Sequence, residues 1–139
     1  MKYLVYISTA YKLLTQDELL DILAVSRKNN ERRNLTGMLL YGEGTFIQVL
    51  EGDIDQLNET YAVIKADPRH KNILKMTEGE ITQRNFPEWL MGFKSVNARE
   101  LEEFGSYIDP ANLNHVSEDN SNMLISMMKT FADANRMTY

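Results

Sequence analysis

The chain has 139 residues, the size of one compact domain, and it has no cysteine, which excludes disulfides, iron–sulfur clusters and thiolate zinc sites. Its 20 acidic and 15 basic residues give a formal net charge of −5, which argues against a nucleic-acid-binding groove. The first residues show no signal-peptide pattern, and no segment approaches the roughly 20 apolar residues of a membrane span. We therefore expect a cytoplasmic protein that binds neither nucleic acid nor membrane.

The first predicted elements are a strand over residues 2–8 and a helix that begins after Thr15. Thr15 and Glu18 form the Thr-x-x-Glu pattern of a capping box. A stripe at helical spacing then leads to Asn29 and Asn30, where we expect the helix to end. The stripe consists of Leu19, Ile22, Leu23 and Ser26. The basic residues near this end are expected to be solvated and to complement the helix dipole; they are Arg27, Lys28, Arg32 and Arg33.

A hairpin follows the first helix. Residues 35–41 and 45–51 are predicted strands, and Gly42-Glu43-Gly44 is the short turn between them. A dinucleotide-binding loop is excluded at these glycines, because such a loop leads into a helix and here a strand follows.

A second helix is predicted from Asp53 to Asp67, because Pro68 disfavours helical geometry in the residue before it. Its buried face is expected to consist of Ile54, Leu57, Tyr61 and Ile64. Two more strands are predicted over residues 72–80 and 88–95.

The element order predicts an α+β protein with a ferredoxin-like βαββαββ sheet and two helices on one sheet face. The tail is expected to cover the other face, with helices over residues 98–108 and 119–136 around a polar loop at 109–118. We thus predict a core over residues 1–97 and a helical extension over residues 98–139. A methionine-rich stripe on the last helix favours core packing, with a partner-binding surface as the alternative.

Three polar residues interrupt this apolar pattern. Gln48 lies in the middle of a strand, Tyr6 lies between Val5 and Ile7, and Asn30 continues the helical stripe. A buried amide without partners costs about 1–3 kcal/mol per unsatisfied group, so each residue requires a hydrogen-bond partner. Taken alone, each of the three is best explained as a core residue whose polar group has a hydrogen-bond partner within the protein. Together they are also consistent with a pocket for a planar ligand with a polar edge.

Other chemistries find little support in the sequence. The two histidines, His70 and His115, lack metal-ligand spacing, so no metal site is expected. No nucleophile elbow or phosphate-binding loop is present, and we predict that the protein is not an enzyme.

Several stretches resemble the BLUF domain, the blue-light sensor that uses a flavin, in that family's order and spacing. They are Leu4–Ser8, Asn29-Asn30, Asn34–Tyr41, Phe46–Gly52, Asp67–His70 and Arg84–Met91. The resemblance spans about residues 2–95 and implies a non-covalently bound flavin between the two helices. FAD is the expected cofactor, with FMN or riboflavin as alternatives.

The resemblance also implies roles for individual residues. Tyr6 is similar to the tyrosine that gives an electron and a proton to the excited flavin. Gln48 is similar to the glutamine that joins this phenol to flavin N5 and O4, and its hydrogen-bond rearrangement produces a reversible red shift. Asn30 is expected at the O4/N3 edge, and Asn29 is a further candidate contact.

Two more groups of residues are carried over from the same family. Arg69 is expected at the pyrimidine edge of the flavin, flanked by Asp67 and His70. Trp89 and Met91 are candidates for the signal relay, and strand register decides which one faces Gln48.

Signal output is expected through another chain, because the sequence shows no effector domain. The resemblance implies an unidentified downstream signalling protein and a homo-oligomer. One alternative is a non-photoactive ferredoxin-like adaptor or oligomerisation module that binds no flavin. Another is a small hydrolase of the same fold, but residues 8–12 lack the glycine and arginine of its anion-binding loop.

Overall fold

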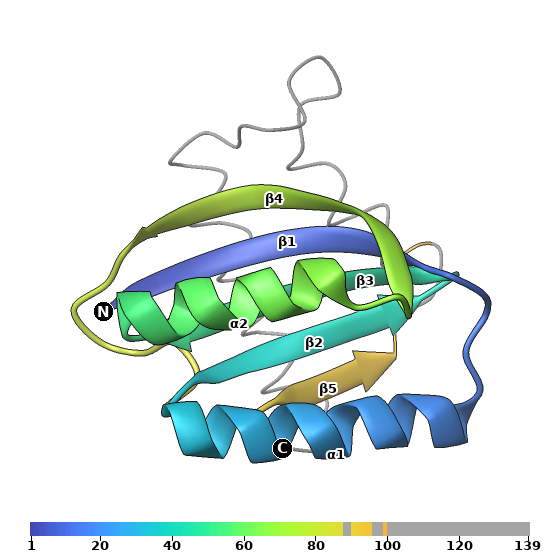
Figure 1. Cartoon of the computed structure of the whole chain (residues 1–139), viewed down its shortest axis with the longest axis horizontal. Coiled ribbons are helices and arrows are strands. Elements are labelled where there is room, and N and C mark those ends of the chain that lie inside the picture. The colour runs from blue at the N-terminus through green and yellow to red at the C-terminus, as the bar shows by residue number, and fades with distance from the viewer. Residues whose placement is uncertain (88–89, 96–98, 100–139) are drawn as a thin grey trace.

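The computed structural model describes residues 1–87, 90–95 and 99 of the chain. Within these residues, a five-stranded sheet carries two helices on one of its faces (Figure 1). The elements in chain order are β1 (Lys2–Ala10), α1 (Gln16–Arg33), β2 (Thr36–Gly42), β3 (Thr45–Gly52), α2 (Ile54–Ala66), β4 (His70–Glu80) and β5 (Gly92–Ser95).

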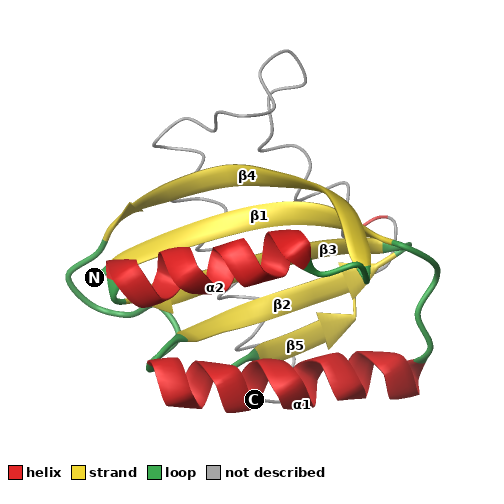
Figure 2. Ribbon diagram, viewed as in Figure 1, coloured by secondary structure: helices red, strands yellow, loops and turns green. Residues whose placement is uncertain are grey.

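The sheet has the strand order β4-β1-β3-β2-β5. Neighbouring strands are antiparallel, except that β5 runs parallel to β2. This confirms the predicted α+β, ferredoxin-like arrangement with an additional edge strand (Figure 2). On the neighbouring strands β1 and β3, Tyr6 is paired directly with Gln48, so their side chains lie on the same sheet face.

Helix α1 begins as predicted and ends one turn later than predicted. Thr15 and Glu18 form a complete capping box. The predicted end at Asn29 and Asn30 is wrong, because the helix continues to Arg33. Asn34 ends it in the left-handed conformation at φ 55°, which asparagine adopts more readily than most residues. Asn30 is buried inside the helix and so faces the sheet.

The hairpin between β2 and β3 turns at Glu43 and Gly44, whose φ angles are 51° and 75°. Two consecutive positive φ values are typical of a type I′ turn, which matches the twist of the flanking strands. The Ala10 amide donates to the Gly44 carbonyl at 2.8 Å, which extends β1 two residues beyond the predicted strand.

Helix α2 begins after the N-cap Asp53 and ends before Asp67, close to the predicted bounds. Leu57 and Tyr61 are buried as expected. The prediction that Ile54 is buried is wrong, since its side chain is 46% exposed. Ile54 is the first residue of the helix and borders a surface groove at the end of the sheet rather than the core.

Strand β5 is shorter than the predicted strand over residues 88–95. Leu90 and Met91 precede it, and their carbonyl groups accept hydrogen bonds from side chains of α1. The backbone just before β5 is therefore hydrogen-bonded to side chains of α1. The predicted tail helices and the boundary at residue 97 lie outside the described residues.

Both faces of the sheet carry buried side chains. The face under the helices contributes to one apolar cluster that includes Leu4, Leu19, Leu23, Leu39, Leu50 and Leu57. The opposite face is also buried, at Val5, Met38, Leu40, Ile47 and Val49. The polar residues Tyr6 and Gln48 lie on the helix side of the sheet.

Candidate functional site

A cavity between α1 and α2 gathers the polar residues that the sequence singled out. The residues predicted to contact a flavin all line it, namely Tyr6, Asn29, Asn30, Gln48, Asp67, Arg69 and His70. They come from β1, α1, β3, the turn between α2 and β4, and the first residue of β4. Chain topology thus brings together residues that are up to 64 positions apart in the sequence.

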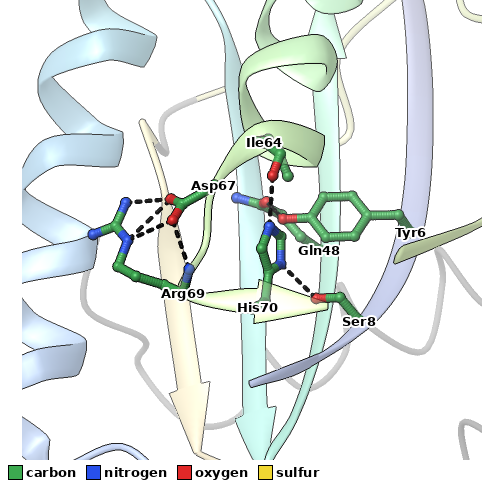
Figure 3. A network of polar contacts seen from close by, with 7 residues as sticks. All are labelled: Tyr6, Ser8, Gln48, Ile64, Asp67, Arg69 and His70. Carbon is green, nitrogen blue, oxygen red and sulfur yellow. Dashed lines mark hydrogen bonds and ion pairs between the residues drawn. The ribbon is translucent and has the colours of Figure 1, made fainter. Parts of the chain in front are cut away.

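Tyr6 and Gln48 form a direct hydrogen bond at the floor of this cavity. The Tyr6 hydroxyl donates to Gln48 Oε1, and both side chains are buried (Figure 3). Burial raises the pKa of the Tyr6 phenol far above its ordinary value, and charge on Tyr61 and Asp67 raises it further. The phenol is therefore a neutral donor, and its proton fixes which end of the Gln48 amide faces it.

The other end of the Gln48 amide contacts the segment before β5. Its Nε2 donates to the Met91 thioether at 3.3 Å, and Met91 is fully buried. Two donors on α1 hold the same segment by its backbone: Asn30 Nδ2 donates to the Leu90 carbonyl at 2.6 Å, and Arg27 Nε donates to the Met91 carbonyl at 3.0 Å. Of the predicted relay pair, Met91 contacts Gln48, and Trp89 lies outside the described residues.

His70 joins three elements beside Tyr6. Its Nε2 lies 2.6 Å from the Ile64 carbonyl, and its Nδ1 lies 2.8 Å from the Ser8 hydroxyl (Figure 3). Because a carbonyl only accepts, Nε2 carries a hydrogen, and in the neutral ring Nδ1 accepts from Ser8. The imidazole therefore ties the end of α2 to β1 and fixes one wall of the cavity.

Asp67 and Arg69 form an ion pair at the same end of the cavity. Arg69 Nη2 lies 2.5 Å from Asp67 Oδ2, and Arg69 Nε lies 3.0 Å from both carboxylate oxygens. These hydrogen bonds lower the pKa of the Asp67 carboxyl below its usual range. Arg69 therefore lines the cavity with its charge already matched by a neighbour.

The lining fits an isoalloxazine ring, which has two apolar faces and one polar edge. Apolar walls come from both helices, including Ile22, Val25, Val63 and Ile64. Val25 and Val63 are 49% and 56% exposed although they line the cavity, so a flat ligand between the helices would cover apolar surface there. Gln48 and Asn30 supply amide donors and acceptors of the kind that the flavin N5, O4 and N3 positions require.

Comparison with known families decides the identity of this site. Residues 1–92 match the family model described as "BLUF: Sensors of blue-light using FAD". The chain belongs to the BLUF family. It is therefore a blue-light sensor that uses a flavin, and the family match disfavours a ferredoxin-like adaptor without one.

Similar sequences include light-regulated proteins of much greater length. The photoactivated adenylate cyclase subunit beta of Euglena longa is 35% identical over 89 residues, which cover 63% of this chain and 10% of the relative. The blue light- and temperature-regulated antirepressor BluF of Escherichia coli is 34% identical over 56 residues, covering 40% of this chain and 14% of the relative. The chain thus matches about a tenth of the length of the cyclase subunit.

Solved structures show the same fold. BlrB, a BLUF protein in its dark state, is 29% identical with a TM-score of 0.72, and the match covers 93% of this chain and 95% of BlrB. A bacterial light-regulated adenylyl cyclase is 35% identical with a TM-score of 0.65, covering 97% of this chain and 34% of the cyclase. The BLUF fold therefore occurs in a short protein and in a longer one that is described as an enzyme.

Within the part of the chain that the structure describes, no helix is long and apolar enough to cross a membrane. Among the same residues, no cluster of histidine and carboxylate side chains could hold a metal ion.

The sequence missed several residues that shape the BLUF site. Ser8 holds His70, and Thr60 of α2 accepts a hydrogen bond from Arg33 at 2.7 Å. The expectation that the basic residues of α1 form a solvated end is wrong for Arg27 and Arg33, which are partly buried. Arg27 donates to the Met91 carbonyl before β5, and Arg33 donates to Thr60 of α2. Both lie on the side of α1 that faces the cavity and β5: Arg27 is three residues before Asn30, and Arg33 is four residues after Asn29.

Proposed function

We propose that Tyr6 and Gln48 carry the photochemistry of this BLUF sensor. The observation that supports the proposal is the buried hydrogen bond from the Tyr6 hydroxyl to Gln48 Oε1 at the floor of the cavity. A phenol and an amide meet there inside an otherwise apolar cluster, next to space for a planar ring.

Tyr6 acts as the donor of an electron and of its phenolic proton. When bound and excited by blue light, the flavin supplies a strong one-electron oxidant. Tyr6 is an oxidisable side chain, and its burial makes a lone charge costly, so the electron and the proton would pass to the flavin together and would return to Tyr6 together, with the flavin left chemically unchanged. The raised pKa keeps this proton on the phenol before light arrives.

Gln48 responds because its two ends are held unequally. Its Oε1 accepts from a phenol, whereas its Nε2 donates to a thioether, which is a weak acceptor. Once Tyr6 releases its proton, Oε1 loses its donor and little holds the amide in place. The amide can then rotate, or tautomerise, and present a different hydrogen-bond pattern to its neighbours without backbone movement.

The segment before β5 receives this change through Met91. Gln48 bonds the Met91 side chain, and Asn30 and Arg27 bond the adjacent backbone carbonyls, so a new Gln48 orientation alters one of three attachments. The outcome is a population shift in β5 and in whatever packs against it. Trp89 stays a second candidate relay residue.

Asn30, Asn29, Asp67, Arg69 and His70 are proposed flavin contacts, in agreement with their place in the cavity lining. The family description names FAD, and FMN and riboflavin stay alternatives. A downstream signalling protein, a homo-oligomer, a cytoplasmic location and a core boundary at residue 97 stay predictions. Relatives described as photoactivated adenylate cyclases support output to another domain or chain.

An absorption spectrum of the flavin-loaded protein before and after blue light tests the proposal. The parent should show a reversible red shift. Tyr6→Phe and Gln48→Leu should keep the flavin but lose the shift, because each removes one member of the buried pair. A Gln48→Leu variant with the photocycle of the parent would refute the assignment.

A further inference from the structure

A second arginine lines the cavity at the end opposite Arg69. Arg33 lies in the last turn of α1, and its Nη1 donates to Thr60 Oγ1 of α2 at 2.7 Å. Its side chain is only 14% exposed. Helices α1 and α2 run antiparallel over the sheet (Figure 1). The end of α1, at Arg33, is therefore at the opposite end of the gap from the end of α2, which Asp67 and Arg69 follow.

The charges of these two lining arginines are matched to different degrees. Arg69 has Asp67 oxygens at 2.5 and 3.0 Å. Arg33 forms an ion pair with Glu59, in which Nη2 lies 3.7 Å from the Glu59 Oε1 atom. The Glu59 side chain is 62% exposed. Thr60 orients the Arg33 guanidinium but brings no negative charge. Arg33 therefore places an incompletely neutralised cation on the cavity wall.

We propose that Arg33 binds the phosphate of the flavin side chain, so that the site selects phosphorylated flavins, FMN or FAD, over riboflavin. The inference rests on the proposed flavin site. In a flavin the side chain leaves from N10, across the ring system from N5. With the N5 and O4 edge at Gln48 on the sheet, the side chain is directed away from the sheet, toward the gap between the helices.

The chemistry of the wall suits such a group. A guanidinium offers a planar fork of N–H donors that matches two phosphate oxygens, and charge-assisted bonds of this kind are stronger than neutral ones. Thr60 holds Nη1, and among the described residues the ion-pair partner of Nη2 is Glu59, at 3.7 Å. A phosphate can therefore displace Glu59 without breaking the bond to Thr60.

Affinity ratios measured by fluorescence titration of flavin-free protein test the inference. FMN should bind the parent at least about tenfold more tightly than riboflavin, the size expected for a hydrogen bond to a charged group. Arg33→Met should remove most of that preference and leave riboflavin affinity within about twofold. Glu59→Gln should increase the preference, because it removes the carboxylate that competes with phosphate.

Lys28→Met is the matched control, since it removes the same charge from an exposed position of α1 that does not line the cavity. Its ratio of FMN to riboflavin affinity should equal that of the parent. Arg33→Lys should keep part of the preference, because the charge remains while the fork is lost. In the parent, rising salt should weaken FMN binding and leave riboflavin binding nearly constant.

Two results would overturn the role of Arg33 while leaving the proposed flavin site intact. One is equal affinity of the parent for FMN and riboflavin. The other is an equal loss of both affinities in Arg33→Met, which would make Arg33 a staple between the helices only. Failure of the parent to bind any flavin would instead overturn the proposed function together with this inference.

Discussion

Gln48 and Met91 are joined by a hydrogen bond of 3.3 Å from the Gln48 amide nitrogen to the Met91 sulfur, and both side chains are buried. This bond helps to hold Gln48 in the orientation in which Oε1 faces Tyr6. Met91→Leu keeps the volume but removes the acceptor, so we expect the light-induced state to decay more slowly, by a factor of about 2–5. The decay of the red-shifted absorption in darkness measures it.

Met38→Leu provides the control for that experiment. Met38 is equally buried, but it lies on β2 and on the sheet face away from the helices. It should recover at the rate of the parent. Identical slowing in both variants would show that core packing, and not the bond to Gln48, sets the lifetime.

Glu51 is a buried carboxylate that anchors the chain between β4 and β5. Its oxygens accept hydrogen bonds from the Thr36 hydroxyl at 3.1 Å, from the backbone N–H of Asn85 at 2.8 Å and from the backbone N–H of Phe86 at 2.5 Å. Glu51→Gln replaces one accepting oxygen by an NH2 group and leaves a backbone donor unmatched. We expect the free energy of unfolding to fall by about 1–3 kcal/mol, measured by urea denaturation.

Glu78→Gln should have a much smaller effect in the same measurement. Glu78 pairs with Lys2 and Lys75 on the surface, and its side chain is 40% exposed. Such pairs typically contribute less than about 1 kcal/mol. A loss in Glu51→Gln no larger than that of Glu78→Gln would contradict the anchoring role.

The Asp67–Arg69 pair predicts a pH dependence of stability. Hydrogen bonds from Arg69 lower the pKa of Asp67 in the folded protein. The unfolded state therefore binds protons more readily, so the contribution is full above the unfolded pKa of about 3.9 and is lost as pH falls through the lowered value. Because Arg69 is 44% exposed, we expect less than about 1 kcal/mol.

Asp67→Asn tests this linkage by comparison with the parent. The difference in unfolding free energy between the two should be present at pH 7 and should shrink as pH falls below about 4. Arg69→Gln should produce the same loss, and the double variant should add little to either. A difference that stays constant down to the lowest pH would show that Asp67 acts through its turn geometry instead.

The sequence predicted the sheet and both helices because their signals are local. Capping by Thr15, the apolar run around Gln48 in β3 and the stop at Asp67-Pro68 each depend on neighbours in the chain. The end of α1 was misplaced because Asn30 resembles a terminating residue, whereas its amide is used inside the helix to reach the Leu90 carbonyl. That partner is 60 residues away, and no local pattern reveals it.

The candidate site was predictable only in part for the same reason. Tyr6 and Gln48 were found because polar groups in apolar strands require partners, and the structure pairs them directly. The resemblance brought in Asp67, Arg69 and His70. Arg33 carries no such signal, since a basic residue at a helix end is normally solvated, and only tertiary packing brings Thr60 to it.

Gly37 on β2 is expected to be intolerant of any side chain. A Cβ added there would lie 2.0 Å from the Val49 carbonyl oxygen, and this contact is with backbone of the neighbouring strand β3. β3 also carries Gln48, so moving it to relieve the clash would disturb the Tyr6–Gln48 pair. Gly37→Ala should lower stability by more than about 2 kcal/mol or prevent soluble expression.

Gly79→Ala distinguishes a specific backbone clash from a general intolerance of β-strand glycines. A Cβ at Gly79 would meet the Tyr3 ring at 3.0 Å, and Tyr3 is a partly exposed side chain that can rotate away. We expect a loss below about 1 kcal/mol, because a flexible neighbour relieves the contact. Thermal unfolding of both variants side by side decides the matter: equal losses would show that loss of glycine, rather than the approach of Val49, is what these strands resist.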